Sequence, residues 1–149
     1  MLKNVTTMAK RTINPARRLA IAMARVCAEN RCREVTILDL RGLSPVTNFF
    51  VLATGTSARQ MHSVADRAVQ AGRELGQRPF GIEGLRTAEG VEASRWVLVD
   101  YVDVVVHVFT GESRKYYDLE LLWGDAPRVN WQRGWRPRPE EPAPAAGDA

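Results

Sequence analysis

The stretch ATGTSARQMH, residues 53–62, is the first place in this chain where residue types and spacing could support chemistry. It sets Gly55, Thr56 and Ser57 between an apolar run and a segment with the pattern of a helix. Backbone N–H groups at the start of a helix, together with the helix dipole, attract anions, and many enzymes hold a phosphate at such a turn. These residues therefore raise the question of whether the chain binds a nucleotide.

A nucleotidyl-transferring enzyme would also need paired carboxylates that hold two magnesium ions roughly 3.5–4 Å apart, and carboxylates spaced i and i+2 on a strand project to one side. Asp100 and Asp103 are three residues apart and flank a turn, and the chain has no Walker lysine and no G-x-G-x-x-G run. A strand-to-helix turn with a hydroxyl N-cap explains Gly55, Thr56 and Ser57 more simply. A nucleotide-binding or nucleotidyltransferase-like enzyme that uses these three residues and Asp103 is the alternative hypothesis.

The histidines and cysteines give weak signals. Cys27 and Cys32 have neither a C-x-x-C spacing nor a histidine near them, so we expect reduced, structural thiols. The sequence places no serine or cysteine where His62 or His107 would activate it, and we expect both histidines to be structural. The sequence thus predicts a protein that is not an enzyme, with no catalytic residue, no cofactor and no metal.

Length and charge narrow the class of protein. The 149 residues predict one domain with tails, and 45% hydrophobic content is enough for a single core. No apolar run approaches the roughly 18 residues that span a bilayer, so we expect a cytoplasmic protein without membrane contact. The net charge of +4 is uneven, because residues 1–29 carry six basic residues and one acidic residue, whereas residues 80–125 carry four basic and nine acidic residues. A partner with a basic surface is therefore expected to bind the middle of the chain.

Periodicity predicts the order helix, strand, strand, helix, strand, strand, strand, helix. We expect an α/β sandwich in which helices flank a mixed β-sheet of about five strands, since the second helix is long enough for a crossover. The last helix should turn Tyr117, Leu121 and Leu122 inward. The expected helices cover 15–30, 57–75 and the segment after Gly111, and the expected strands cover 34–40, 48–55, the FGIEG segment at 80–84 and a hairpin within 95–110.

One strand of the hairpin carries the candidate binding residues. Alternation puts Trp96, Leu98 and Asp100 on one face and the neighbouring apolar residues on the other. The sequence agrees equally well with two roles for Trp96: a residue of the core, or an aromatic anchor for a partner. In the second reading Glu83, Asp100 and Asp103 form an acidic rim around the anchor, a composition expected of a hot spot that faces a basic protein.

Four blocks of the sequence resemble the ribosomal silencing factor family, also called RsfS or Iojap. The blocks stand in the family's order at FFVLATGTSARQMHSVAD (49–66), GIEGL (81–85), WVLVDYVDVVVHVF (96–109) and YYDLELLWGDAP (116–127). The resemblance implies a nucleotidyltransferase-like α/β fold without that superfamily's catalysis.

The resemblance also implies three parts of the chain. A family-like domain is expected over residues 15–126, after a basic N-terminal extension at 1–14 and before a tail rich in Pro and Arg at 127–149, which we expect to be disordered.

The resemblance further implies a function. Members of the family bind the L-fourteen protein of the large ribosomal subunit, on the face that the small subunit covers, and block joining of the subunits when nutrients are short. The contacts expected here are Trp96, Leu98, Glu83, Asp100, Asp103 and Tyr117. Basic side chains of the two ends would add a weak, salt-sensitive contact with ribosomal RNA through Arg11, Arg17, Arg18, Arg133, Arg136 and Arg138. The sequence does not determine the oligomeric state, and a homodimer is among the alternatives.

Two positions depart from the family pattern. Asn48 stands where the family usually has Asp, and Val102 stands where it usually has Gly, in the turn of the hairpin. A β-branched residue does not easily take a positive φ. Val102 therefore predicts a turn of another type, or a turn one residue longer than in relatives.

Overall fold

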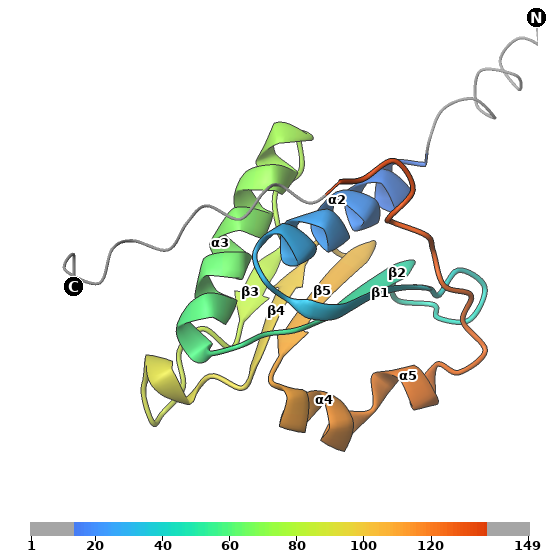
Figure 1. Ribbon diagram of the computed structural model, residues 1–149. Coiled ribbons are helices and arrows are strands. Elements are labelled where there is room, and N and C mark those ends of the chain that lie inside the picture. Colours follow the sequence, from blue (N-terminus) through green and yellow to red (C-terminus); the bar gives the residue numbers. More distant parts are fainter. Residues whose placement is uncertain (1–13, 137–149) are drawn as a thin grey trace, which may run out of the picture.

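The structure is a computed structural model that describes residues 14–136 (Figure 1). Its elements are α2 (Pro15–Glu29), β1 (Arg33–Asp39), β2 (Phe49–Thr54), α3 (Ala58–Glu74), β3 (Gly81–Glu83), the short 3₁₀ helix η1 (Val91–Ala93), β4 (Trp96–Asp100), β5 (Val104–Phe109), α4 (Gly111–Tyr117) and α5 (Leu119–Leu122). Each helix and strand expected from the sequence is present within one or two residues of its predicted ends, except that the last helix is divided in two.

The five strands form one sheet in the order β1-β2-β5-β4-β3. The pair β2–β5 is parallel and the other three pairs are antiparallel, so the predicted mixed sheet is confirmed. The helices α2 and α3 lie together across one face of the sheet (Figure 1). Their buried side chains, such as Met23 and Met61, pack on Val51, Val97 and Val106 to make the main core.

The two long helices begin where capping chemistry predicts. Asn14 caps α2 by accepting a hydrogen bond from Ala16 N at 2.9 Å, and Pro15 takes the first helical position, where no N–H is needed. Ser57 caps α3 by accepting from Gln60 N at 3.1 Å. These caps set the start of each helix that covers the sheet.

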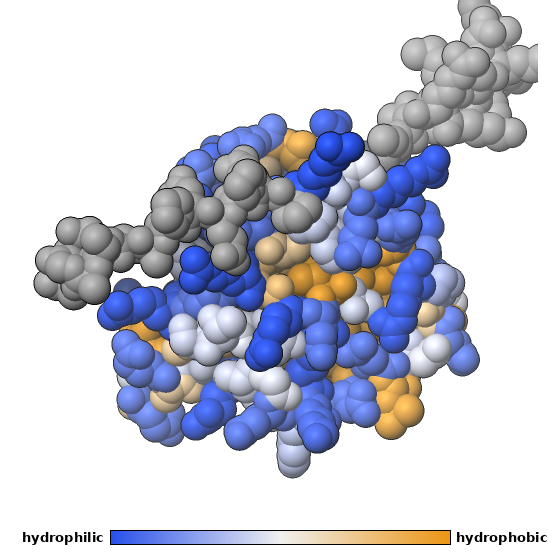
Figure 2. Space-filling view, viewed as in Figure 1, coloured by the Kyte–Doolittle hydropathy of each residue, from blue (hydrophilic) through white to orange (hydrophobic). Residues whose placement is uncertain are grey.

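The last helix differs from the prediction. The chain leaves the helical conformation at Asp118, which has a left-handed φ of 44°, and the Asp118 side chain then caps the next short helix at Leu121 N. Because the two turns are not one continuous helix, the expected inward stripe does not form: Tyr117, Leu121 and Leu122 are 54%, 77% and 71% exposed. The prediction that these three side chains face inward was wrong, and Figure 2 shows apolar side chains on the surface at the lower right, where α5 lies.

Residues 127–136 form a strap along the edge strand β1, which contradicts the expectation of disorder from residue 127. The main chain of the strap bonds to β1 through Asp39 N to Pro127 O at 2.8 Å and Val129 N to Ile37 O at 3.0 Å. In Figure 1 this segment runs from α5 past β1 toward α2. The strap covers an edge that would otherwise expose unpaired backbone groups. Residues 1–13 and 137–149 lie outside the part of the chain that the structure describes.

Trp131 anchors the strap. The residue is 9% exposed and belongs to the main core, and its Nε1–H donates to Val35 O at 3.0 Å. Trp135 lies against it with ring centroids 5.1 Å apart, and Arg25 of α2 donates to the carbonyls of Trp131 and Arg133. The high content of Pro, Arg and Gly in this segment led to the prediction of disorder. That prediction gave no weight to its two Trp residues, whose indole rings bury apolar surface.

The turn between β4 and β5 also differs from the prediction. Val102 has a φ of +71°, although a β-branched side chain is strained there. The hydrogen bond from Asp103 N to Tyr101 O at 2.9 Å closes a three-residue γ-turn around Val102, and the Asp100 carboxylate accepts from Val102 N at 2.7 Å. The turn therefore stays short and holds Val102 in the positive-φ conformation that we expected it to avoid.

Candidate functional site

The second face of the sheet is only partly covered. Near β1 its residues Leu38, Leu52 and Phe109 are buried under the α5 region, through Leu119, Trp123 and Ala126. The remaining side chains of this face are only half-buried, apart from one buried histidine. We call this surface the open face, and it consists of Phe50, Trp96, Leu98, Val105 and His107.

A groove of about 420 Å³ follows the open face. Its floor is formed by side chains of β2, β4 and β5, one wall by the loop before β2 together with Trp123, and the other wall by β3 and the hairpin turn. The residues that line it are Phe50, Leu98, Val105 and His107 on the floor, Ser44, Val46, Thr47 and Trp123 on the first wall, and Phe80, Glu83, Asp100 and Val102 on the second. A hollow of about 310 Å³ adjoins the groove at Glu83, Gly84, Trp96 and Leu98.

The structure brings most of the predicted binding residues to this surface. Glu83, Trp96, Leu98 and Asp100 line the groove or the adjoining hollow. Tyr117 adjoins them through its ring, whose centroid lies 4.7 Å from that of Trp96.

Asp103 lies apart from this group. It is exposed on the hairpin turn, its carbonyl accepts hydrogen bonds from Asn48 N and Phe49 N, and its side chain does not line the groove. Its charge can act on a partner only from the edge of the open face.

Trp96 combines the two roles that the sequence left open. Its ring is half-buried against Phe109 and Tyr117, and its Nε1–H donates to His107 Nδ1 at 3.0 Å. The exposed part of the ring lines the hollow beside Glu83. Trp96 is therefore fixed by the fold while it presents an indole surface to a partner.

His107 is a buried, neutral base in the floor of the groove. It is 4% exposed, and burial lowers the pKa of its imidazole to about 4. Because the Trp96 indole can only donate, Nδ1 accepts this hydrogen bond and the ring proton lies on Nε2.

Comparison with known proteins identifies the family. Residues 13–148 match the family model described as "Ribosomal silencing factor during starvation". The chain belongs to this family. It is 41% identical over 101 residues to the ribosomal silencing factor RsfS of Halalkalibacterium halodurans, which covers 68% of this chain and 81% of that protein. It is 39% identical over 116 residues to RsfS of Bacillus subtilis, with 78% and 92% covered.

Solved structures of relatives have the same fold. A crystal structure of a protein from Chromobacterium violaceum is similar with a TM-score of 0.61 and 35% sequence identity, over 73% of this chain and 83% of that one. In this ribosomal silencing factor family member, the third block that carries the family resemblance builds β4 and β5, and the fourth covers the end of α4 and all of α5. These are the elements that shape most of the open face.

The residues of the nucleotide hypothesis do not come together in this family member. Gly55 follows the last residue of β2, whereas Asp103 precedes β5 beside the first residue of β2, so they lie at opposite ends of a parallel strand pair. A Cβ at Gly55 would collide with the Met61 side chain, and Gln60 Oε1 accepts from Thr56 N at 3.0 Å. The turn at Gly55, Thr56 and Ser57 thus serves to cap the start of α3.

Among the described residues 14–136, no group of three or more His, Cys, Asp or Glu side chains is arranged to hold a metal ion. No helix in that range is long and apolar enough to cross a membrane.

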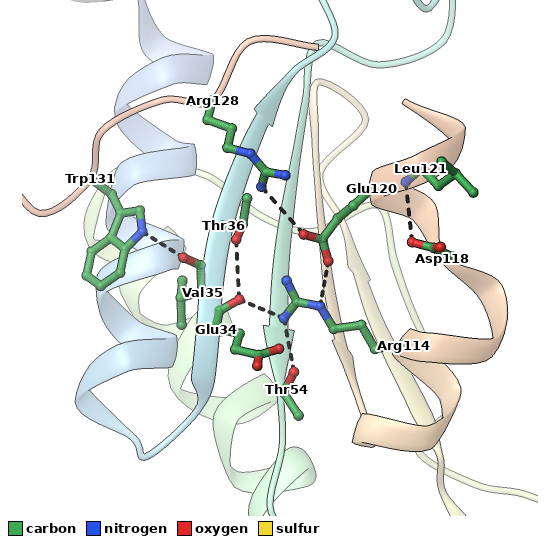
Figure 3. Close-up of polar contacts among 10 residues, drawn as sticks. All are labelled: Glu34, Val35, Thr36, Thr54, Arg114, Asp118, Glu120, Leu121, Arg128 and Trp131. Atoms are coloured by element: carbon green, nitrogen blue, oxygen red, sulfur yellow. Dashed lines mark hydrogen bonds and ion pairs between the residues drawn. The ribbon is translucent and has the colours of Figure 1, made fainter. Parts of the chain in front are cut away.

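A buried arginine fixes α4 and α5 beside the open face (Figure 3). Arg114 is 7% exposed and donates to Glu120 Oε1 at 2.8 Å, to Glu34 O at 2.6 Å and to Thr54 Oγ1 at 3.0 Å. Burial favours a higher pKa for Glu120, but Arg114 and Arg128 outweigh it and hold the pKa of this carboxyl below its usual value. This network ties the two short helices to β1 and β2, and so positions Tyr117 and Trp123.

Sequence reasoning missed most of the groove, because only Glu83, Leu98 and Asp100 of its twelve lining residues were expected contacts. Phe50, Thr47, Phe80 and Trp123 were not among the expected contacts, and His107 was assigned a structural role only. Alternation in β2 and β5 carried a usable signal, because Phe50 and His107 share the face of Trp96 and Leu98. The loop residues gave no such signal, because their positions depend on the folded chain.

Proposed function

We propose that this protein represses translation by binding the large ribosomal subunit with its open face and preventing the small subunit from joining. The partner is the L-fourteen protein of the large subunit, and the conditions are those of nutrient limitation. The relatives are named ribosomal silencing factors, which supports a regulatory role. The observation that carries the proposal is an apolar groove with acidic residues on its wall, placed on the face of the sheet that α2 and α3 leave free.

The apolar content of the groove favours a protein partner. Val46 and Phe80 on its two walls are 78% and 83% exposed, and the half-buried ring of Phe50 lies between them on the floor. Exposed apolar surface of this kind, rimmed by polar residues, marks protein–protein contact sites. Trp96 adds an aromatic residue already held in position, which keeps the entropic cost of binding low.

The charges favour a basic partner. Glu83 and Asp100 stand on one wall of the groove, and Asp103 lies on the turn beside it. An acidic rim attracts a basic ribosomal protein and repels bare RNA phosphates. It therefore raises the rate of association with such a protein and favours that protein over RNA as a partner. The positively charged Arg17, Arg18 and Arg133 lie on α2 and the strap, away from the groove, where they would add weak contact with ribosomal RNA.

The proposed mechanism is steric. Bound protein occupies the surface that the small subunit needs, so the free energy of binding alone accounts for repression and no reaction step is required. The function is thus that of a cytoplasmic binding protein that needs neither cofactor nor metal.

Sedimentation tests the proposal. The full-length protein should co-sediment with isolated large subunits and not with isolated small subunits. When both subunits are mixed, increasing protein should lower the fraction that forms whole ribosomes. Equal binding to both subunits, or binding to large subunits without loss of joining, would contradict the proposed mechanism.

A further inference from the structure

Two buried polar atoms without a hydrogen-bond partner lie in residues that line the groove. Within residues 14–136, the buried side-chain nitrogen and oxygen atoms that lack a partner are His107 Nε2 and Thr47 Oγ1. Both residues line the groove, His107 on its floor and Thr47 on its wall. Buried polar groups in folded proteins are nearly always paired, so two exceptions beside one groove call for a common explanation.

The chemistry of the first atom is fixed by Trp96. Since Nδ1 of His107 accepts the indole hydrogen bond at 3.0 Å, the neutral ring carries its proton on Nε2. Nε2–H is therefore a donor that needs an acceptor. The hydroxyl of Thr47 can donate as well, so each of the two groups can bind an oxygen acceptor in the groove.

The surroundings select the kind of acceptor. Glu83 and Asp100 on the opposite wall repel a carboxylate or a phosphate, which leaves an uncharged oxygen. The same two carboxylates favour a cationic side chain close to that oxygen. A peptide segment supplies both features, because its main-chain carbonyl is uncharged and a neighbouring Lys or Arg can reach the acidic wall.

We propose that the groove binds an extended segment of the partner protein, with main-chain carbonyls bonded to His107 Nε2–H and to Thr47 Oγ1–H and a nearby Lys or Arg paired with Glu83 and Asp100. This inference rests on the proposed function, and it names the contacts by which the groove recognises its partner specifically. The half-buried ring of Phe50, whose centroid is 4.5 Å from that of His107, borders the imidazole. Because Nε2 is buried in the free protein, the proposal requires the Phe50 ring to move aside for the carbonyl oxygen.

Two substitutions at His107 separate the donor from the acceptor. In His107→Asn the amide takes the place of Nδ1, so Trp96 keeps an acceptor and the groove loses its donor. In His107→Gln the amide reaches the place of Nε2 and can donate again. We expect affinity for large subunits to fall about tenfold in His107→Asn, to fall several-fold in Thr47→Val, and to recover in part in His107→Gln.

The wild-type protein provides a readout that does not depend on the folding of any variant. In protein labelled with ¹⁵N-histidine, the Nε2–H proton of His107 should shift downfield and exchange more slowly with water when the isolated L-fourteen protein binds. If the wild type binds and this proton does not move, or if His107→Asn and Thr47→Val bind as tightly as wild type, the inference is wrong while the proposed function stands. If the wild type does not bind large subunits, both are wrong.

Discussion

The indole Nε1–H of Trp96 donates to His107 Nδ1 across 3.0 Å and so joins β4 to β5 on the open face. This bond fixes the ring of Trp96 and the tautomer of His107 at once. Both effects need a neutral imidazole, since a protonated ring has no lone pair to accept with. The open face is therefore built around a histidine that stays uncharged near neutral pH.

The buried imidazole predicts how stability depends on pH. Burial lowers the pKa of His107 to about 4, below the value of about 6.5 in an unfolded chain, so between these values only the unfolded chain binds the proton. The free energy of unfolding should fall as the pH drops from about 6.5 toward 4, by up to about 3 kcal/mol. Urea unfolding at about pH 7 and pH 5 measures it. His107→Asn should show a smaller difference between the two pH values, and an equal difference would exclude His107 as the cause.

Val102→Gly should stabilise the protein. The φ of +71° at Val102 costs a β-branched residue roughly 1 kcal/mol or more, and glycine removes that cost. Val102 is 52% exposed, so little buried area is lost. We expect a higher urea midpoint for Val102→Gly and a lower one for the control Val105→Gly, which lies within β5. A lower midpoint for Val102→Gly would show that the turn is not strained.

Trp131→Ala should destabilise the fold although it lies far from the groove. Trp131 is 9% exposed and bonds to the edge strand, so its removal leaves a cavity and frees the strap, at a cost of about 3 kcal/mol. The half-buried neighbour Trp135 is the matched control, and Trp135→Ala should cost less. Chemical denaturation compares the two. Equal, small losses would mean that the strap does not contribute to the core.

The acidic rim should control the rate of association. The test variant combines Glu83→Lys and Asp103→Lys with Asp100→Asn, because the Asp100 side chain accepts from Val102 N and the amide oxygen preserves that bond. Association of the wild type with the isolated L-fourteen protein should slow as salt rises, since the Debye length is only about 8 Å at physiological ionic strength. The variant should bind slowly, with a flat or inverted salt dependence. Identical slopes in stopped-flow measurements would leave the rim without a role in recognition.

The sequence predicts the parts of this fold that local chemistry determines. The caps at Asn14 and Ser57 and the alternation of Trp96 with Val97 are local signals, and each is confirmed. The family resemblance is confirmed as well.

The parts that sequence reasoning missed depend on contacts far along the chain. Trp131 bonds to Val35, 96 residues earlier, and nothing within its own Pro- and Arg-rich segment indicates that partner. Asp118 breaks the last helix because its side chain caps the next turn, and a single residue of that kind overrides a helical period. Val102 keeps a strained φ because Asp100 and the γ-turn bond hold it there. Propensity alone does not include these compensating bonds.

The central claim is that the groove on the open face contacts the large subunit. Val46 and Phe80 are the most direct probes, because they line the groove from opposite walls and are 78% and 83% exposed, so their substitution should cost little stability. The control is Val91→Ser in η1, which is 47% exposed and does not line the groove.

The decisive measurement is the equilibrium affinity of three proteins for isolated large subunits by sedimentation: wild type, the double variant Val46→Ser with Phe80→Ser, and Val91→Ser. We predict that the double variant binds at least about tenfold more weakly than wild type while its urea midpoint is unchanged, and that Val91→Ser binds normally. A double variant that is folded and binds large subunits as tightly as wild type would contradict the assignment of the open face as the binding surface.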